Sequence, residues 1–198
     1  MDIAETQRLA WEECVVAEWD PELALSFGEE VAHLHEEVSE TLGAYRKYGD
    51  FALHQGPGGK PEGVGAELAD VLIGLLYNAR RFGVDLGTRV PVVPAAACSA
   101  GGFGEEVGRL HEVVSNIFRA YRRYHDFAPH VGPDGEPDGV DVKMTLAVAH
   151  LMAAAGCFGA DLGEAFKAKH FWNLQRNYQD EGRCLHPTRS PRAAGLSR

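Results

Sequence analysis

The feature that most constrains the fold of this chain is an internal duplication. The pentapeptide FGEEV at residues 27–31 recurs at residues 103–107, an offset of 76 (103 − 27 = 76). Across residues 27–87, roughly half of the positions are identical to their counterparts in the second copy, far more than chance gives for one supersecondary unit. We therefore expect one structural unit that occurs twice, rather than a longer repeat array.

Each copy has the pattern of two helices joined by a loop. In the first copy, the apolar residues of two stretches recur at intervals of three and four, which is the period of an amphipathic helix. The first stripe is Val31, Leu34, Val38, Leu42 and Tyr45, and the second is Val64, Leu68, Val71, Leu72, Leu75, Leu76, Ala79 and Phe82. A loop rich in glycine and proline separates them over residues 56–63 and returns over residues 132–139. Each copy is thus predicted to be an antiparallel helical hairpin.

Two further helices are predicted outside the copies, over residues 3–18 and 162–178. No segment combines β-branched alternation with hairpin signals, so we expect no strands. The predicted fold is an all-α bundle in which two repeats pack as an internal pseudo-dimer. The predicted organisation is a first repeat over residues 1–88, a linker over 89–101, a second repeat over 102–180 and a disordered tail over 181–198.

Composition narrows the functional classes. A formal net charge of −10 over 198 residues disfavours general nucleic-acid binding, because the protein would repel a phosphate backbone. No apolar run approaches the roughly 20 residues of a membrane span, and the acidic N-terminus lacks the features of a secretory signal. The four cysteines are scattered without a CxxC pair, which favours reduced thiols. These observations predict a cytoplasmic protein.

Two acidic pairs in the first copy carry the chemical prediction. They are Glu37-x-x-Glu40 on the first helix and Glu67-x-x-Asp70 on the second. Residues three apart share a helix face, so two antiparallel helices could present four carboxylates to one point. Such a cluster is costly unless cations lie within it, and Mg²⁺ or Mn²⁺ prefers oxygen ligands. The competing interpretation is that these are ordinary solvated acids on helix surfaces.

The second copy favours the metal-site interpretation. All four acids are replaced there, by Val113, Asn116, Lys143 and Leu146, while the surrounding residues persist. The four acids therefore behave as one functional unit, which predicts one metal centre in the chain.

The order Glu36-Glu37-x-x-Glu40 followed by Glu67-x-x-Asp70 resembles the EExxE…ExxD pattern of the MazG-like all-α nucleoside triphosphate pyrophosphohydrolases. This group also contains dimeric dUTPases and phosphoribosyl-ATP pyrophosphohydrolase. The resemblance covers much of the chain: residues 7–12 (QRLAWE) are similar to the opening helix of the group, residues 66–72 (AELADVL) to its ELADVL helix, and residues 82–86 (FGVDL) to the segment that ends it.

The resemblance implies a substrate-contacting helix with a K-xxx-N-xx-R motif. This motif occurs only after the second copy, as Lys169, Asn173 and Arg176. The implied site is composite, with metal ligands from the first half and substrate-binding residues from the second. The implied catalytic residues are Glu36 and Glu37, where Glu36 would orient a water. However, its counterpart Glu112 persists in the second copy, which favours a surface role for Glu36.

The implied reaction is Mg²⁺-dependent release of pyrophosphate from a nucleoside triphosphate (NTP or dNTP), in a house-cleaning or dUTPase-like role. The alternative is a non-catalytic nucleotide-binding or regulatory bundle. A di-iron enzyme, which Glu30-x-x-His33 suggests, is disfavoured because the second copy has Glu106-x-x-Arg109 and no second ExxH occurs at a suitable place. A monomer and a homodimer both fit, and the sequence does not identify the base or sugar.

The segment Gly58-Gly59-Lys60 is interpreted as loop composition, because Pro61 stands where a phosphate-binding P-loop has serine or threonine. His35 and His111 are duplicated, so we expect packing or surface roles for them.

Overall fold

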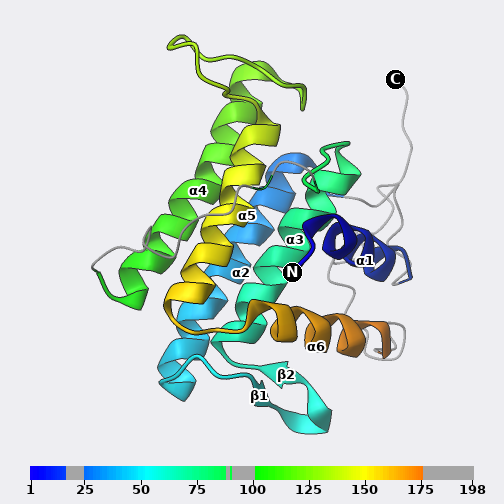
Figure 1. Ribbon diagram of the computed structural model, residues 1–198, viewed down its shortest axis with the longest axis vertical. Coiled ribbons are helices and arrows are strands. Elements are labelled where there is room, and N and C mark those ends of the chain that lie inside the picture. Colours follow the sequence, from blue (N-terminus) through cyan, green and yellow to red (C-terminus); the bar gives the residue numbers. More distant parts are fainter. Residues whose placement is uncertain (17–24, 88–89, 91–100, 176–198) are drawn as a thin grey trace, which may run out of the picture.

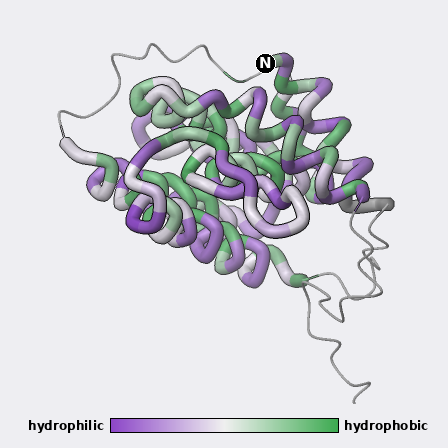
Figure 2. Tube along the Cα trace, turned by 90° about the horizontal axis from the view of Figure 1, so that it is seen from below, coloured by the Kyte–Doolittle hydropathy of each residue, from purple (hydrophilic) through white to green (hydrophobic). Residues whose placement is uncertain are grey.

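The protein folds as an all-α bundle, as the sequence predicts. The computed structural model describes residues 1–16, 25–87, 90 and 101–175 (Figure 1). Within these ranges, the helices are α1 (Ile3–Val16), α2 (Phe27–Tyr48), α3 (Val64–Arg81), α4 (Phe103–Tyr124), α5 (Val140–Cys157) and α6 (Leu162–Gln175). Figure 2 shows hydrophobic and hydrophilic positions alternating along the helices, as expected of helices with one buried face.

The two copies form two helical hairpins, α2 with α3 and α4 with α5, and these hairpins pack against each other through α2 with α4 and α3 with α5. Helix α3 is the centre of the bundle, since α1 and α6 also pack on it and contact each other (Figure 1). Most of its side chains are buried, including Leu68, Val71, Leu72, Leu75 and Leu76. Any site on α3 therefore lies between the two flanking helices and the rest of the bundle.

The first helix of each copy is bounded differently. In α2, Ser26 and Glu29 form a capping box, in which the Ser26 side chain accepts from the Glu29 backbone and the Glu29 carboxylate accepts from the Ser26 N–H. Gly49 ends the helix with a φ of 75°, which glycine adopts without strain. The equivalent positions of α4 are Gly102, without a side-chain cap, and His125, with a φ of 58°. The first copy thus has the better capped helix.

The expectation of no strands is wrong at one place. A short antiparallel hairpin, β1 (His54–Gln55) with β2 (Pro61–Glu62), fills the loop between α2 and α3, and the 3-10 turn Pro57–Gly59 forms its tip. The hairpin forms because the glycines allow a tight reversal, in which the Gly56 N–H donates to the Lys60 carbonyl at 2.7 Å. Two-residue strands leave no alternation for a sequence pattern to detect. The second copy keeps the same register as a single bridge between Val131 and Pro137.

The two copies meet around an internal pseudo-two-fold axis. His35 and His111 are equivalent residues, and their Nδ1 atoms lie 2.9 Å apart across the α2–α4 contact. The aromatic contacts beside them come in reciprocal pairs, as in an isologous dimer interface: Phe27 contacts Tyr121 and Phe127, and its counterpart Phe103 contacts Tyr45 and Phe51. The duplicated histidines therefore have the packing role that their duplication suggests.

Several predicted boundaries fall partly outside the described residues. The helix predicted over 3–18 is described as far as Val16, and the helix predicted over 162–178 as far as Gln175. Most of the predicted linker and the whole tail over 181–198 lie outside the described ranges. Cys157 is disulfide-bonded, so the expectation that all four cysteines are reduced is wrong.

Helix α5 is long and apolar enough to cross a membrane by length and composition alone, although the sequence scan expects no such segment. In the structure, 61% of the 18-residue window Val140–Cys157 is buried against the rest of the bundle. This burial matches the position of α5 between α3 and α4, and it accounts for the apolar composition of the helix as that of a core element.

Candidate metal centre

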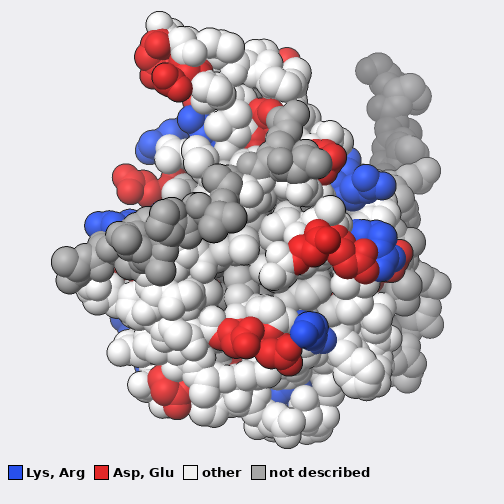
Figure 3. Space-filling view, viewed as in Figure 1, with Lys and Arg blue, Asp and Glu red and all other residues white. Residues whose placement is uncertain are grey.

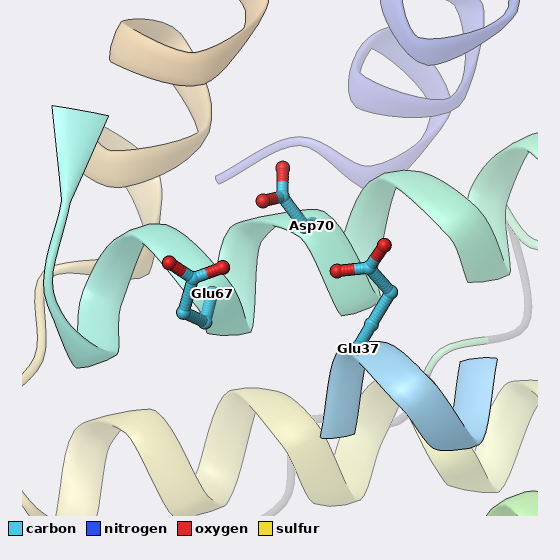
Figure 4. A group of neighbouring side chains, drawn as sticks. All are labelled: Glu37, Glu67 and Asp70. Carbon is cyan, nitrogen blue, oxygen red and sulfur yellow. The ribbon is translucent and has the colours of Figure 1, made fainter. Parts of the chain in front are cut away.

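Three acidic side chains converge between α2 and α3. Glu37 reaches from α2 towards Glu67 and Asp70, which lie one turn apart on the same face of α3 (Figure 4). One carboxylate oxygen of each residue lies within 4.8 Å of the others, close enough to share a cation. The arrangement follows from the sequence, because the three-residue spacing on α3 aligns two acids and the antiparallel packing of α2 brings in the third.

The three carboxyl groups are partly buried, and this burial disfavours their ionised forms. Burial, reinforced by the charges of Asp70, Glu40 and Glu67, raises the pKa of Glu37 to about 8. Burial likewise raises the pKa of Glu67 to about 7 and shifts the pKa of Asp70 above its ordinary value. Carboxyl groups whose ionised forms are disfavoured by burial in this way are stabilised as anions by a bound cation.

One positive charge from the chain already lies in the cluster. Lys169 of α6 is 4% exposed, and its ammonium forms an ion pair with Asp70. Burial lowers the pKa of Lys169, but the charges of Asp70, Glu67 and Glu37 outweigh it and hold the pKa above its ordinary value. With all groups ionised, three carboxylates and one ammonium leave two negative charges (−3 + 1 = −2). That charge balance matches a divalent cation.

A second polar cluster lies beside Asp70, between α1 and α6. Glu13 is 5% exposed, accepts a hydrogen bond from Asn173, and lies 3.0 Å from Nδ1 of His170. Burial raises the pKa of Glu13, and the nearby charge of Asp70 adds to the shift.

Sequence reasoning missed Glu13, although a signal was present. The buried face of α1 runs through Ile3, Thr6, Gln7 and Ala10, and Glu13 continues it at helical spacing. A carboxylate on the buried stripe of a helix requires partners, and these partners are 157 and 160 residues away along the chain.

The structure separates the remaining predicted site residues from this group. Glu40 is exposed and lies outside the group of three, although its charge contributes to the raised pKa values of Glu37 and Glu67. The side chain of Glu36 is 71% exposed and lies outside the group as well. Asn173 donates to Glu13, and Arg176 lies outside the described residues.

The Glu30-x-x-His33 pair does not converge on one point in the structure. Glu30 forms a buried ion pair with Arg81 at the end of α3. The imidazole of His33 faces the acidic group instead, with Nε2 3.3 Å from a carboxylate oxygen of Glu37. Glu30 and His33 therefore contact different residues and do not form a shared metal site.

The equivalent positions of the second copy carry no carboxylate. Lys143 stands in place of Glu67 and forms an ion pair with Asp138 at 2.6 Å, and Leu146 stands in place of Asp70 and is 48% exposed. Asn116, in place of Glu40, accepts a hydrogen bond from Arg119. Among the described residues, Glu37, Glu67 and Asp70 form the one group of three or more potential metal ligands.

Comparison of the chain with protein-family models, with curated proteins and with solved structures finds no match. The fold and the acidic group define the class as an all-α bundle with a candidate divalent-cation centre.

Proposed function

We propose that the chain is a divalent-metal-dependent nucleoside triphosphate pyrophosphohydrolase of the MazG-like kind, which converts an NTP or dNTP to the monophosphate and pyrophosphate. The observation that carries this proposal is the convergence of Glu37, Glu67 and Asp70 from two helices, with ligand oxygens within 4.8 Å of one another. The sequence pattern that singles out these residues is the one that resembles the EExxE…ExxD motif of that group.

The donor set fits Mg²⁺ or Mn²⁺ better than a softer metal. All three candidate ligands are carboxylates, which these hard cations prefer, and each of the three side chains is only partly buried. A bound divalent cation would supply charge neutralisation for the triphosphate and would activate a water. The −2 balance of the cluster supports this choice of ion.

The chain's own residues would orient and neutralise the substrate. Lys169, held by Asp70, is placed to share its ammonium with a phosphate oxygen once the carboxylate binds a cation. Asn173 and His170 are held by Glu13, which fixes the face of α6 that the K-xxx-N motif assigns to substrate. Arg176 would add a second positive charge. Glu37 would hold a proton at neutral pH without a cation and release it when the cation binds.

A single chain brings the two halves of this site together. Lys169 and Asn173 follow the second copy, yet they lie against residues of α3 and α1. The composite site expected from the resemblance would therefore need residues of one chain only. The partner that the site implies is a nucleoside triphosphate.

The decisive experiment is to measure pyrophosphate release from a panel of NTPs and dNTPs with Mg²⁺ or Mn²⁺. We expect turnover of at least one nucleotide, and its loss on chelation of the metal. Nucleotide binding without release from any member would instead favour a non-catalytic nucleotide-binding bundle. The absence of both binding and release would overturn the proposal.

A further inference from the structure

The hairpin between α2 and α3 contacts neighbouring helices at its base and at its tip. At its base, Glu62 of β2 accepts a hydrogen bond from Tyr48 and pairs with Lys47 at 2.6 Å. At its tip, Gly58 has a φ of 68°, and a Cβ there would lie 3.6 Å from the indole of Trp172 on α6. The turn that carries Lys60 is thus fixed between α2 and α6 rather than projecting freely.

Lys60 lies near the acidic group but forms no ion pair with its three carboxylates. It directly precedes β2, which packs against both α3 and α6, the helices that carry Glu67 and Lys169. From this place its positive charge lowers the pKa values of both Glu67 and Asp70, against the larger effect of burial. The residue is exposed, and in the described part of the chain its ammonium has no ion-pair partner. Lys169, by comparison, is buried and paired with Asp70. Among the described cations of this site, Lys60 is therefore the one available to a ligand arriving from solvent.

The second copy shows that the hairpin scaffold does not need this lysine. It repeats the supporting interactions at equivalent positions: Arg123 and Tyr124 with Asp138, and Asp126 with His130. The residue equivalent to Lys60 is Glu136, a reversal of charge. The lysine is thus lost in the same copy that lost the four acids, while the residues that support the turn are kept. This comparison indicates that Lys60 is not needed to support the hairpin and that it occurs only in the copy that carries the acidic group.

We propose that Lys60 binds the phosphate chain of the substrate, at phosphate oxygens that a cation held by Glu37, Glu67 and Asp70 leaves free. The inference rests on the proposed function, and it names a polyphosphate as the part of the substrate that the hairpin recognises. A lysine ammonium is suited to this task because it offers three donors and a full charge to oxygens with few geometric demands. The binding surface is then two-sided, with Lys60 on the hairpin and Lys169 on α6.

The test uses the full chain and titrates it with inorganic tripolyphosphate in excess Mg²⁺, and separately with Mn²⁺ alone, by calorimetry. Lys60→Ala should weaken tripolyphosphate binding by about tenfold or more, the size of one charge-assisted hydrogen bond. Lys60→Arg should restore most of the affinity. Mn²⁺ affinity should stay the same or rise in Lys60→Ala, because a nearby positive charge has been removed.

The second copy supplies the matched control. Glu136→Ala alters the same position of the equivalent hairpin and should leave tripolyphosphate affinity unchanged. Unchanged affinity in Lys60→Ala, equal weakening in Glu136→Ala, loss of Mn²⁺ binding in Lys60→Ala, or no tripolyphosphate binding by the wild type would each overturn the inference.

Turnover separates this inference from the proposed function. If the wild type hydrolyses nucleotides while Lys60→Ala binds tripolyphosphate normally, the role of Lys60 is wrong and the enzyme assignment stands. If Lys60 is needed for tripolyphosphate binding but no nucleotide is hydrolysed, the role of Lys60 stands and the enzyme assignment is wrong.

Discussion

The two copies share a skeleton and differ in chemistry. The pairs that hold each hairpin are equivalent in sequence position: Asp50 with His54 at 2.8 Å and Asp126 with His130 at 2.7 Å, and Glu62 and Asp138 each with a basic residue and a tyrosine. The positions that form the acidic group in the first copy carry Val113, Lys143 and Leu146 in the second. The residues that hold the hairpin and the residues that form the acidic group are therefore different sets within the same unit.

The surroundings of the two copies differ as well. In the first, α1 and α6 pack on α3, and residues from both reach the vicinity of Asp70. In the second, Leu146 is 48% exposed at the equivalent position of α5. Charged side chains on the face seen in Figure 3 gather over α1 and α6 in mixed groups, where Arg8 pairs with Glu5 and Glu12 and Lys167 pairs with Glu164. These exposed charged residues of α1 and α6 thus form ion pairs within each helix at the surface, whereas Glu13 of α1 and Lys169 of α6 are buried near Asp70.

The largest expected difference between the copies concerns cation binding. Glu67→Gln removes one of three converging ligands, and we expect Mn²⁺ affinity and any nucleotide turnover to fall by about 100-fold or more, beyond the ~10–100-fold typical of residues that only orient a ligand. Titration calorimetry measures the first and pyrophosphate release the second.

The matched variant for this experiment is Lys143→Gln, at the equivalent position of α5. It removes the ion pair with Asp138 and should leave Mn²⁺ affinity unchanged. A similar loss in both variants would mean that the effect is a general consequence of altering the bundle, and the distinction between the copies would then fail.

The shared skeleton predicts equal losses where the copies are equivalent. Phe27 and Phe103 are each 5% exposed and make reciprocal aromatic contacts across the interface. Phe27→Ala and Phe103→Ala should each lower the free energy of unfolding by about 3 kcal/mol through lost burial and a residual cavity. Urea denaturation of the two variants measures the losses, and values that differ by more than about 1 kcal/mol would contradict the pseudo-symmetry.

Stability above neutral pH should depend mainly on the acidic group of the first copy. The pKa values of Glu37 and Glu67 are raised to about 8 and about 7 in the folded chain, so folding favours their protonated forms and stability is lost as the pH rises through these values. In cation-free solution, we expect Tm to fall by about 5 °C between pH 6.5 and 9. The pKa values of His35 and His111 are lowered by burial from the ordinary value of 6.5, so their contribution to stability has the opposite sign and offsets part of the fall near the lower end of this window.

Two changes should reduce this slope: added Mg²⁺ or Mn²⁺, which stabilises the anions, and Glu37→Gln together with Glu67→Gln, which removes the two groups with the pKa values given above. Thermal denaturation followed by circular dichroism measures both. A Tm that stays constant over the window in cation-free wild type would mean that the carboxylates are solvated after all.

The helices and most of the acidic group could be predicted because their signals are local. The apolar stripes fix which faces of α2 and α3 are buried, and the position of Glu37, Glu67 and Asp70 relative to these stripes brings them to the seam between the helices. The reciprocal aromatic contacts were foreseeable in kind, since a duplicated unit that packs on its copy forms equivalent contacts twice.

The parts that could not be predicted depend on distant contacts or on small rotations. The partners of Glu13 belong to α6, and no periodicity within α1 indicates them. The β1–β2 hairpin depends on turn geometry set by Gly56 and Gly58 rather than on a strand pattern. The four acids formed one set in the sequence, but a three-residue step advances a helix by about 300° and leaves residues about 60° apart on the face, enough to expose one and half-bury the other.

Glu40 is the residue on which that difference can be measured, and its expected effect is the smallest. It is exposed and outside the group of three, so Glu40→Gln should weaken Mn²⁺ binding less than tenfold, through loss of a nearby negative charge rather than of a ligand. The same loss of charge should ease the ionisation of Glu37 and Glu67, whose pKa values Glu40 helps to raise, and so reduce the pH slope of the cation-free chain. Its counterpart control is Asn116→Asp, which adds a charge to the second copy and should leave Mn²⁺ affinity unchanged. If Glu40→Gln instead abolishes Mn²⁺ binding as fully as Glu67→Gln, the Glu40 side chain must turn inward when the cation binds, and the centre has four carboxylate ligands rather than three.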